Sequence, residues 1–267
     1  MRYVLALIAV FVTGSIGYVL SNDYVSERSQ QATYYQTMQV ANDKARMEYL
    51  MKTGAGRTGI NWATIKTDKP VSLDELTGQY QLIKRTKEEY TMHTRTYTTT
   101  DSKGHSTTHM ETYWTWDYAG SESKQSENVF IDGVKTKSSK IDLPTKDLKL
   151  KKKMFNNKIT YGIFFKHEGW ISGNDYYTDS YTRYSYEYTP VITKYTIFAN
   201  LKNKQILPLK NESMIETYDK SVSQVKNQYN QTARNAKKSY IIVVVISIVV
   251  GLVVIFTYDR LQFDDLN

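Results

Sequence analysis

Two long, uncharged apolar stretches lie near the ends of the chain, at residues 3–20 and 240–258. As helices rising 1.5 Å per residue, each is long enough to cross the ~30 Å hydrocarbon core of a bilayer. We therefore predict transmembrane helices at residues 1–20 and 239–258, followed by a short tail at 259–267. The first stretch could instead be a signal peptide, but its length and its poor cleavage site favour an uncleaved anchor.

Each apolar stretch borders a segment that reads as a soluble helix. Residues 21–52 contain neither Pro nor Gly, and residues 213–238 place apolar side chains at alternating spacings of three and four. Ser213 and Glu216 have the spacing of a capping box, which predicts a helix start there. We predict stalk helices at residues 21–53 and 213–238 that pack as an antiparallel coiled coil. The predicted seam consists of Ile215, Tyr218, Val222, Val225 and Tyr229.

Small residues recur four apart in the first apolar stretch, at Ala9, Thr13 and Gly17. Such a stripe lets another transmembrane helix approach closely. Small residues are also common in membrane helices in general, so the stripe could occur without any second helix packed against it.

The middle of the chain, residues 60–209, is rich in Tyr and Thr and predicts strands. Its clearest signal is a hairpin, with strands at 89–100 and 105–118 around a turn at 101–104. A symmetric turn would place Met92 opposite Tyr113 and Arg95 opposite Met110. Further strands are predicted at 128–134, 146–155, 159–167, 181–189 and 191–201, with a bend at Pro190.

The predicted fold class follows from these elements. We expect an α+β membrane protein with two transmembrane helices, each continued by a long soluble helix, and a β-rich domain inserted between them. The chain has 267 residues, a formal net charge of +8 and no Cys. The lack of Cys excludes disulfides and thiolate chemistry, and it suits a bacterial or phage protein, or a domain kept in the cytosol, better than an animal ectodomain.

A basic run and a group of tyrosines are the candidate binding residues. Lysines in the run suit anionic lipid or polymer, although alternation with Leu148 and Leu150 also predicts an edge strand whose lysines block pairing. Alternate tyrosines could line a contact surface or the inner face of a sheet. The candidates are Lys149, Lys151, Lys152, Lys153, Tyr184, Tyr186 and Tyr188.

No catalytic or cofactor motif is recognisable in the β-rich region. His105 and His109 lie four apart, which on a strand separates them by roughly 13 Å, too far to share a metal ion. No paired carboxylates and no serine-nucleophile elbow are present. We expect no enzyme, no metal and no cofactor.

The flanking charges conflict over sidedness. Arg2 and the acidic residues after the first stretch favour a cytoplasmic N-terminus, whereas Arg234, Lys237 and Lys238 lie on the domain side of the second stretch. The first helix usually dominates orientation. We therefore expect both termini to be cytoplasmic and the β-rich domain to lie outside the plasma membrane.

The predicted function is a membrane-anchored scaffold that displays its β-rich domain on a helical stalk for binding. The expected partners are the bilayer, an unknown protein or anionic polymer, and further copies of the chain. We do not expect nucleic acid as a partner, because no recognition pattern for it is present. The alternative is a subunit of an oligomeric two-pass channel or pore, for which the apolar stretches offer few hydroxyls, such as those of Thr13, Ser15 and Ser247.

Overall fold

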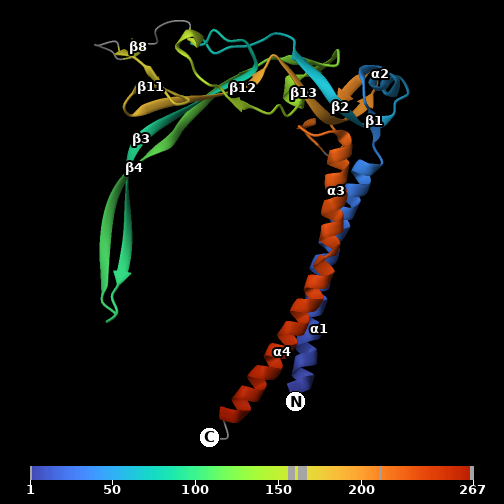
Figure 1. Ribbon diagram of the computed structural model, residues 1–267, viewed down its shortest axis with the longest axis vertical. Helices are drawn as coiled ribbons and strands as arrows, with labels where there is room; N and C mark the ends of the chain where they lie inside the picture. Colours follow the sequence, from blue (N-terminus) through green and yellow to red (C-terminus); the bar gives the residue numbers. More distant parts are fainter. Residues whose placement is uncertain (1, 156–159, 162–166, 211, 265–267) are drawn as a thin grey trace.

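The computed structural model describes residues 2–155, 160–161, 167–210 and 212–264. Two long helical segments run side by side and carry a β-rich domain at one end (Figure 1). Both chain termini lie at the other end of the helical pair. The α+β class is therefore confirmed, with the strands inserted between the helical segments.

The first helical segment is α1 (Arg2–Gln36), and the second consists of α3 (Val222–Lys237) and α4 (Ser239–Asp264). Lys238 joins the last two in a helical conformation, with φ −67° and ψ −18°. Two helical stretches, Tyr3–Gln36 and Val222–Tyr258, are long and apolar enough to cross a membrane. The predicted tail is wrong in one respect, because α4 continues through Asp264.

Small residues bring the apolar halves of α1 and α4 together. A Cβ atom added at Gly17 would lie 2.8 Å from Val243 Cγ1, and one at Gly251 would lie 2.5 Å from Val10 Cγ2. Gly17 of the predicted stripe therefore faces α4. Thr13 instead donates its hydroxyl to the Ala9 carbonyl at 2.7 Å, within its own helix.

The first helix is shorter than the predicted stalk segment 21–53. It ends at Gln36, and β1 (Gln39–Ala41) then pairs in parallel with β2 (Gly56–Thr67). A separate helix, α2 (Lys44–Lys52), begins where the Asp43 carboxylate accepts the Arg46 N–H at 2.7 Å. The break in the helix buries two side chains in different cores: Met38 packs with Phe198 and Val222, and Ala41 of β1 packs in the core of the first sheet.

The second helical segment starts later than predicted, at Val222 rather than at residue 213. Ile215 and Tyr218 are therefore not on a helical seam: Ile215 is fully buried in the β domain, and Tyr218 ends β15 (Glu216–Tyr218). The Ser213 box is wrong as a helix start. The real capping box pairs Ser221 with Gln224. Extended chain prevails here because β15 pairs with β13 and Ile215 bridges Ile141, which satisfies the backbone and places Ile215 in the first core.

Two sheets lie side by side in the β domain (Figure 1). The sheet nearer the helices has the order β14-β13-β2-β5-β6, and the other has β10-β11-β12-β3-β4. β12 runs directly into β13, so the predicted bend at Pro190 joins the two sheets. The first sheet comprises β14 (Gln205–Leu207), β13 (Ile192–Lys202), β2, β5 (Asn128–Ile131) and β6 (Val134–Lys137), with β1 and β15 attached. The second comprises β10 (Trp170–Ser172), β11 (Asp175–Asp179), β12 (Thr182–Pro190), β3 (Tyr80–Thr100) and β4 (Ser106–Gln125), with β7 (Lys146–Asp147) attached.

Most of the predicted strand 159–167 lies outside the described residues. Near its two ends, β8 (Thr160–Tyr161) and β9 (His167–Glu168) are described, and they pair with each other. The predicted strand 146–155 is not continuous: β7 pairs with β12 at its start, Lys152–Met154 turns as a 3₁₀ helix, and Phe155 forms a single bridge to Leu76. Leu148 and Leu150 nevertheless point into the core while the lysines between and after them are exposed, as the edge-strand alternative predicted.

The predicted hairpin is confirmed as β3 and β4, but its register differs by one residue. Met92 lies opposite Trp114, and Arg95 lies opposite Glu111. The loop contains one residue more than the symmetric turn assumed: Thr100 pairs with Ser106. The Asp101 carboxylate accepts the N–H groups of Lys103 and His105, both at 2.9 Å, and Gly104 takes φ +83°.

A separate core joins the helical segments to the first sheet. Phe198 of β13 is 1% exposed and packs edge-on against Tyr35 of α1, with ring centroids 5.1 Å apart. Tyr35 also stacks on Tyr229 of α3 at 4.0 Å. Lys226 donates to the carbonyls of Gln36 at 3.1 Å and Met38 at 2.8 Å, where α1 ends. The β domain is therefore fixed to both helical segments by buried contacts.

Candidate binding surface on the β domain

An exposed group of aromatic rings lies where the hairpin leaves the second sheet. Tyr90 faces Trp116 across the β3–β4 ladder, with ring centroids 5.1 Å apart, and stacks on Trp114 at 5.4 Å. Residues directly opposite on antiparallel strands approach within about 5 Å, so the register itself brings these rings together. We call the group the aromatic surface: Tyr90, Trp114, Trp116, Trp170, Tyr177 and Tyr181.

The outer members of this surface come from the neighbouring strands. Trp170 of β10 stacks on Tyr177 of β11 at 5.4 Å, and Tyr177 meets the Trp116 ring edge-on at 5.8 Å. Trp114 is 48% exposed, Trp170 44% and Tyr181 58%. Rings that pack against one another and still remain so exposed form a contiguous patch, and contiguous patches of this kind mark contact sites more often than single exposed side chains do.

A paired charge supports the aromatic surface. The Arg183 guanidinium lies 4.5 Å from the centroid of the Trp116 ring. It donates to Glu88 at 2.8 Å and makes an ion pair with Asp175 at 3.2 Å. Burial raises the pKa of the Asp175 carboxyl, and the nearby Arg183 opposes that effect. The surface therefore offers flat π faces and phenol hydroxyls over a compensated charge, which suits contact with a macromolecule.

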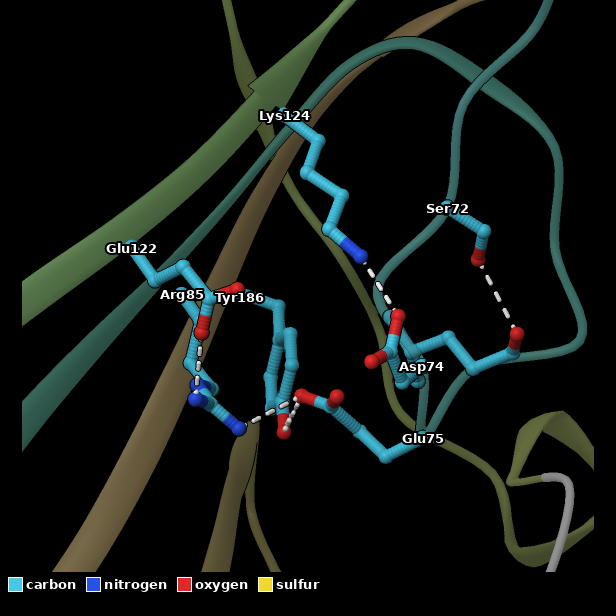
Figure 2. Close-up of polar contacts among 8 residues, drawn as sticks. Ser72, Asp74, Glu75, Arg85, Glu122, Lys124 and Tyr186 are labelled. Carbon is cyan, nitrogen blue, oxygen red and sulfur yellow. Dashed lines mark hydrogen bonds and ion pairs between the residues drawn. The ribbon is translucent and has the colours of Figure 1, made fainter.

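A second polar cluster fastens the segment 72–76 to the same sheet (Figure 2). The Arg85 guanidinium lies between Glu75, at 2.9 Å, and Glu122, at 2.6 Å. Tyr186 donates to the same Glu75 carboxylate at 3.1 Å. Beside them Lys124 contacts Asp74 at 2.5 Å, and Ser72 donates to the Leu76 carbonyl at 3.0 Å. Each cation here faces a carboxylate, so the arrangement holds a loop in place.

The sequence-predicted tyrosines belong to the interior of this region. Tyr186 is 3% exposed in the second core, and Tyr184 and Tyr188 pack against the same core. Burial removes Tyr186 from the residues that a macromolecule can reach, as the inner-face alternative predicted. Lys149, Lys151, Lys152 and Lys153 are exposed, and binding by them stays a prediction.

Thr91, His93 and Asp117 form a contact cluster on the other face of the hairpin that superficially resembles a catalytic triad. The Thr91 hydroxyl, at 3.1 Å, and the Asp117 carboxylate, at 2.5 Å, approach the same ring nitrogen, His93 Nε2. A triad uses the two ring nitrogens separately, so this geometry cannot relay a proton. The hydrogen bond from Thr91 and then the contact with His93 lower the pKa of the Asp117 carboxyl.

Sequence reasoning did not select the aromatic surface as a candidate site, although part of it leaves a signal in the sequence. Trp114 and Trp116 lie two apart on one strand, and this spacing alone places both on one face. Trp170 and Arg183 carry no comparable signal, because only the pairing of β11 with β12 and of β12 with β3 brings them there.

The described residues contain no group of three or more His, Asp or Glu side chains that could hold a metal ion. Comparison of the chain with protein-family models, with curated proteins and with solved structures finds no match to any of them.

Proposed function

We propose that the chain is a two-pass protein of the plasma membrane, of bacterial or phage type, that holds its β domain off the bilayer to bind another macromolecule without catalysis. One observation carries this proposal. The two apolar segments lie together at one end of the helical pair, and the exposed aromatic surface belongs to the domain at the other end (Figure 1).

The helices between these ends form an antiparallel coiled-coil stalk in this proposal. Buried or half-buried residues on α1 recur at spacings of four and three, and those on α3 do so at mixed spacings of three and four. The α1 positions are Ser21, Val25, Arg28, Ala32 and Tyr35, and the α3 positions are Val222, Val225, Tyr229, Ala233 and Ala236. The polar length of α1, residues 21–36, rises by ~24 Å and sets the distance of the domain from the bilayer.

Binding through the aromatic surface is tested with the full chain in the membrane of its native host. Photo-crosslinking in the native host should capture a partner that Trp114→Ala and Trp116→Ala each lose. Trp62→Ala is the matched control, because Trp62 is 43% exposed on β2, in the other sheet. Equal capture by all three variants would contradict the proposed surface.

The proposed sidedness places both termini in the cytoplasm and the domain outside. The chain lacks Cys, so one cysteine at Lys103→Cys reports sidedness directly. An impermeant maleimide should label it in intact cells. Labelling only after lysis would place the domain in the cytoplasm.

A channel is the alternative, and the geometry lends it little support. Ser247 donates to the Val243 carbonyl at 2.9 Å and is 5% exposed, between the two helices of one chain. Ser247 is therefore covered within one chain, and the Thr13 hydroxyl bonds within its helix, so Ser15 is the exposed hydroxyl of the three. Planar-bilayer recording tests this: reproducible single-channel currents that bulky substitution of Ser247 abolishes would overturn the binding proposal.

A further inference from the structure

The outer part of the β3–β4 hairpin is an arm that no other strand of the described residues accompanies. The pairing of β12 with β3 ends at Thr182 and Glu89, whereas β3 and β4 continue together to Thr100 and Ser106. We call residues 90–116 the free arm. Both of its faces are largely exposed toward the tip, so the arm projects into the surroundings instead of covering the domain.

The free arm points toward the same end of the molecule as the apolar helical segments. Figure 1 shows it bending away from the second sheet and descending on the side of the domain from which α1 and α4 extend, down to the level of the α1 label. An extended strand from residue 90 to residue 100 spans ~36 Å. The polar part of α1, residues 21–36, spans only ~24 Å. The arm is therefore longer than the polar part of α1, in line with the level that its tip reaches in Figure 1.

The side chains near the tip suit the boundary between lipid and water. Met110 is 77% exposed, slightly more than Phe11 of the apolar segment at 75%, and Tyr97 is 46% exposed. Lys103 is exposed in the loop. Tyr rings with a polar tip and Lys side chains with an apolar stem are stable at headgroup level.

Several polar groups near the tip are paired within the arm. Thr100 and Ser106 share a hydrogen bond at 3.0 Å, and Arg95 pairs with Glu111 at 2.7 Å. A ribbon whose strands bond to each other can enter the headgroup layer without losing backbone hydrogen bonds. Its hydroxyl-rich surface keeps it out of the hydrocarbon.

We infer that the tip of the free arm is a third membrane contact, resting in the headgroup layer of the bilayer that α1 and α4 cross. This inference rests on the proposed membrane anchorage. The arm and the stalk then support the domain at two separated places, so the domain keeps a fixed tilt and the aromatic surface a fixed orientation relative to the bilayer.

The test uses the full chain reconstituted in phosphatidylcholine vesicles that contain lipids with a nitroxide headgroup. A dye attached at Lys103→Cys should lose most of its fluorescence. The same dye at Lys52→Cys, at the end of α2 on the opposite side of the domain, should keep it. Met110→Glu should weaken the quenching at position 103, whereas Met92→Glu, farther from the tip on the same face, should leave it unchanged.

A third dye site separates this inference from the anchorage on which it rests. Val245→Cys, in the apolar segment of α4, should be quenched by lipids with a nitroxide on the acyl chain. Quenching at position 245 without quenching at position 103 would overturn the arm contact and leave the anchorage intact. Loss of both would overturn the anchorage as well. Crosslinking of position 103 in cells to a protein, with no quenching by lipid, would also overturn the inference.

Discussion

Close packing of α1 on α4 depends on the absence of a side chain at Gly17. A Cβ atom there would lie 2.8 Å from Val243 Cγ1 and 3.2 Å from Val243 Cγ2. Val243 is β-branched and has one preferred rotamer in a helix, so its methyl groups cannot turn away. Gly17→Ala must therefore push the helices apart. Overpacking of this kind costs about 1–3 kcal/mol.

Gly14 provides the matched control in the same helix. A Cβ atom at Gly14 would lie 3.5 Å from Ser247 Oγ, which is an ordinary van der Waals contact. Gly14→Ala adds the same methyl group to the same apolar segment, so we expect its free energy of unfolding to stay close to that of the parent chain. Gly17→Ala combined with Val243→Ala should recover most of the loss, because it removes the methyl groups that clash.

The assay uses the contact between the hydroxyls of Ser21 and Ser239. Ser21→Cys with Ser239→Cys in the otherwise Cys-free chain should form an intramolecular disulfide while the helices are packed. Its yield across an SDS titration gives the free energy of helix separation for each variant. A midpoint for Gly17→Ala equal to that of Gly14→Ala would refute the packing argument, and crosslinks only between chains would refute the antiparallel pair within one chain.

Three further predictions concern the junction and the hairpin. Ser221→Ala should lower the free energy of unfolding by about 0.5–2 kcal/mol, measured by thermal denaturation, because it removes the side-chain cap of α3. Ser213→Ala should change that free energy little. Lys226→Met should lower the free energy of unfolding by about 1–3 kcal/mol, measured by chemical denaturation, because it leaves the carbonyls at the end of α1 without their donor. Lys237→Met is the exposed control, and an equal effect of both substitutions would contradict this reasoning. The pKa of Asp117 is lowered in the fold, so its contribution to stability is present above the ordinary aspartate pKa and lost as the pH falls through the lowered value. The protection factors of the hairpin amides, which are exchange rates corrected for the intrinsic effect of pH, should therefore fall in acid. Asp117→Asn should flatten that dependence; protection factors with the same pH profile in both chains would show that the contact does not matter.

Local patterns in the sequence were sufficient for the elements whose neighbours are close along the chain. The apolar segments follow from their uncharged composition, since a run of such residues has only one stable form in lipid. The hairpin follows from alternation around residues 101–104, because its two strands are adjacent in sequence. Leu148 and Leu150 point inward for the same reason: alternation on an extended chain fixes their side.

Contacts between distant segments decided the rest. Residues 37–41 and 213–218 have helical spacing, yet strands form there because β2 and β13 offer unpaired edges and a core for Met38 and Ile215. The register of the hairpin depends on its loop, in which the Asp101 carboxylate accepts two backbone N–H groups. This loop is one residue longer than a symmetric turn, and the extra residue shifts every pair of the ladder by one. The aromatic surface joins β3, β4, β10, β11 and the turn before β12, and no spacing along the chain shows that β10 and β11 lie beside the hairpin. Periodicity reports which side of its own element a residue occupies, whereas the identity of the facing element depends on burial and hydrogen bonding summed over the whole domain.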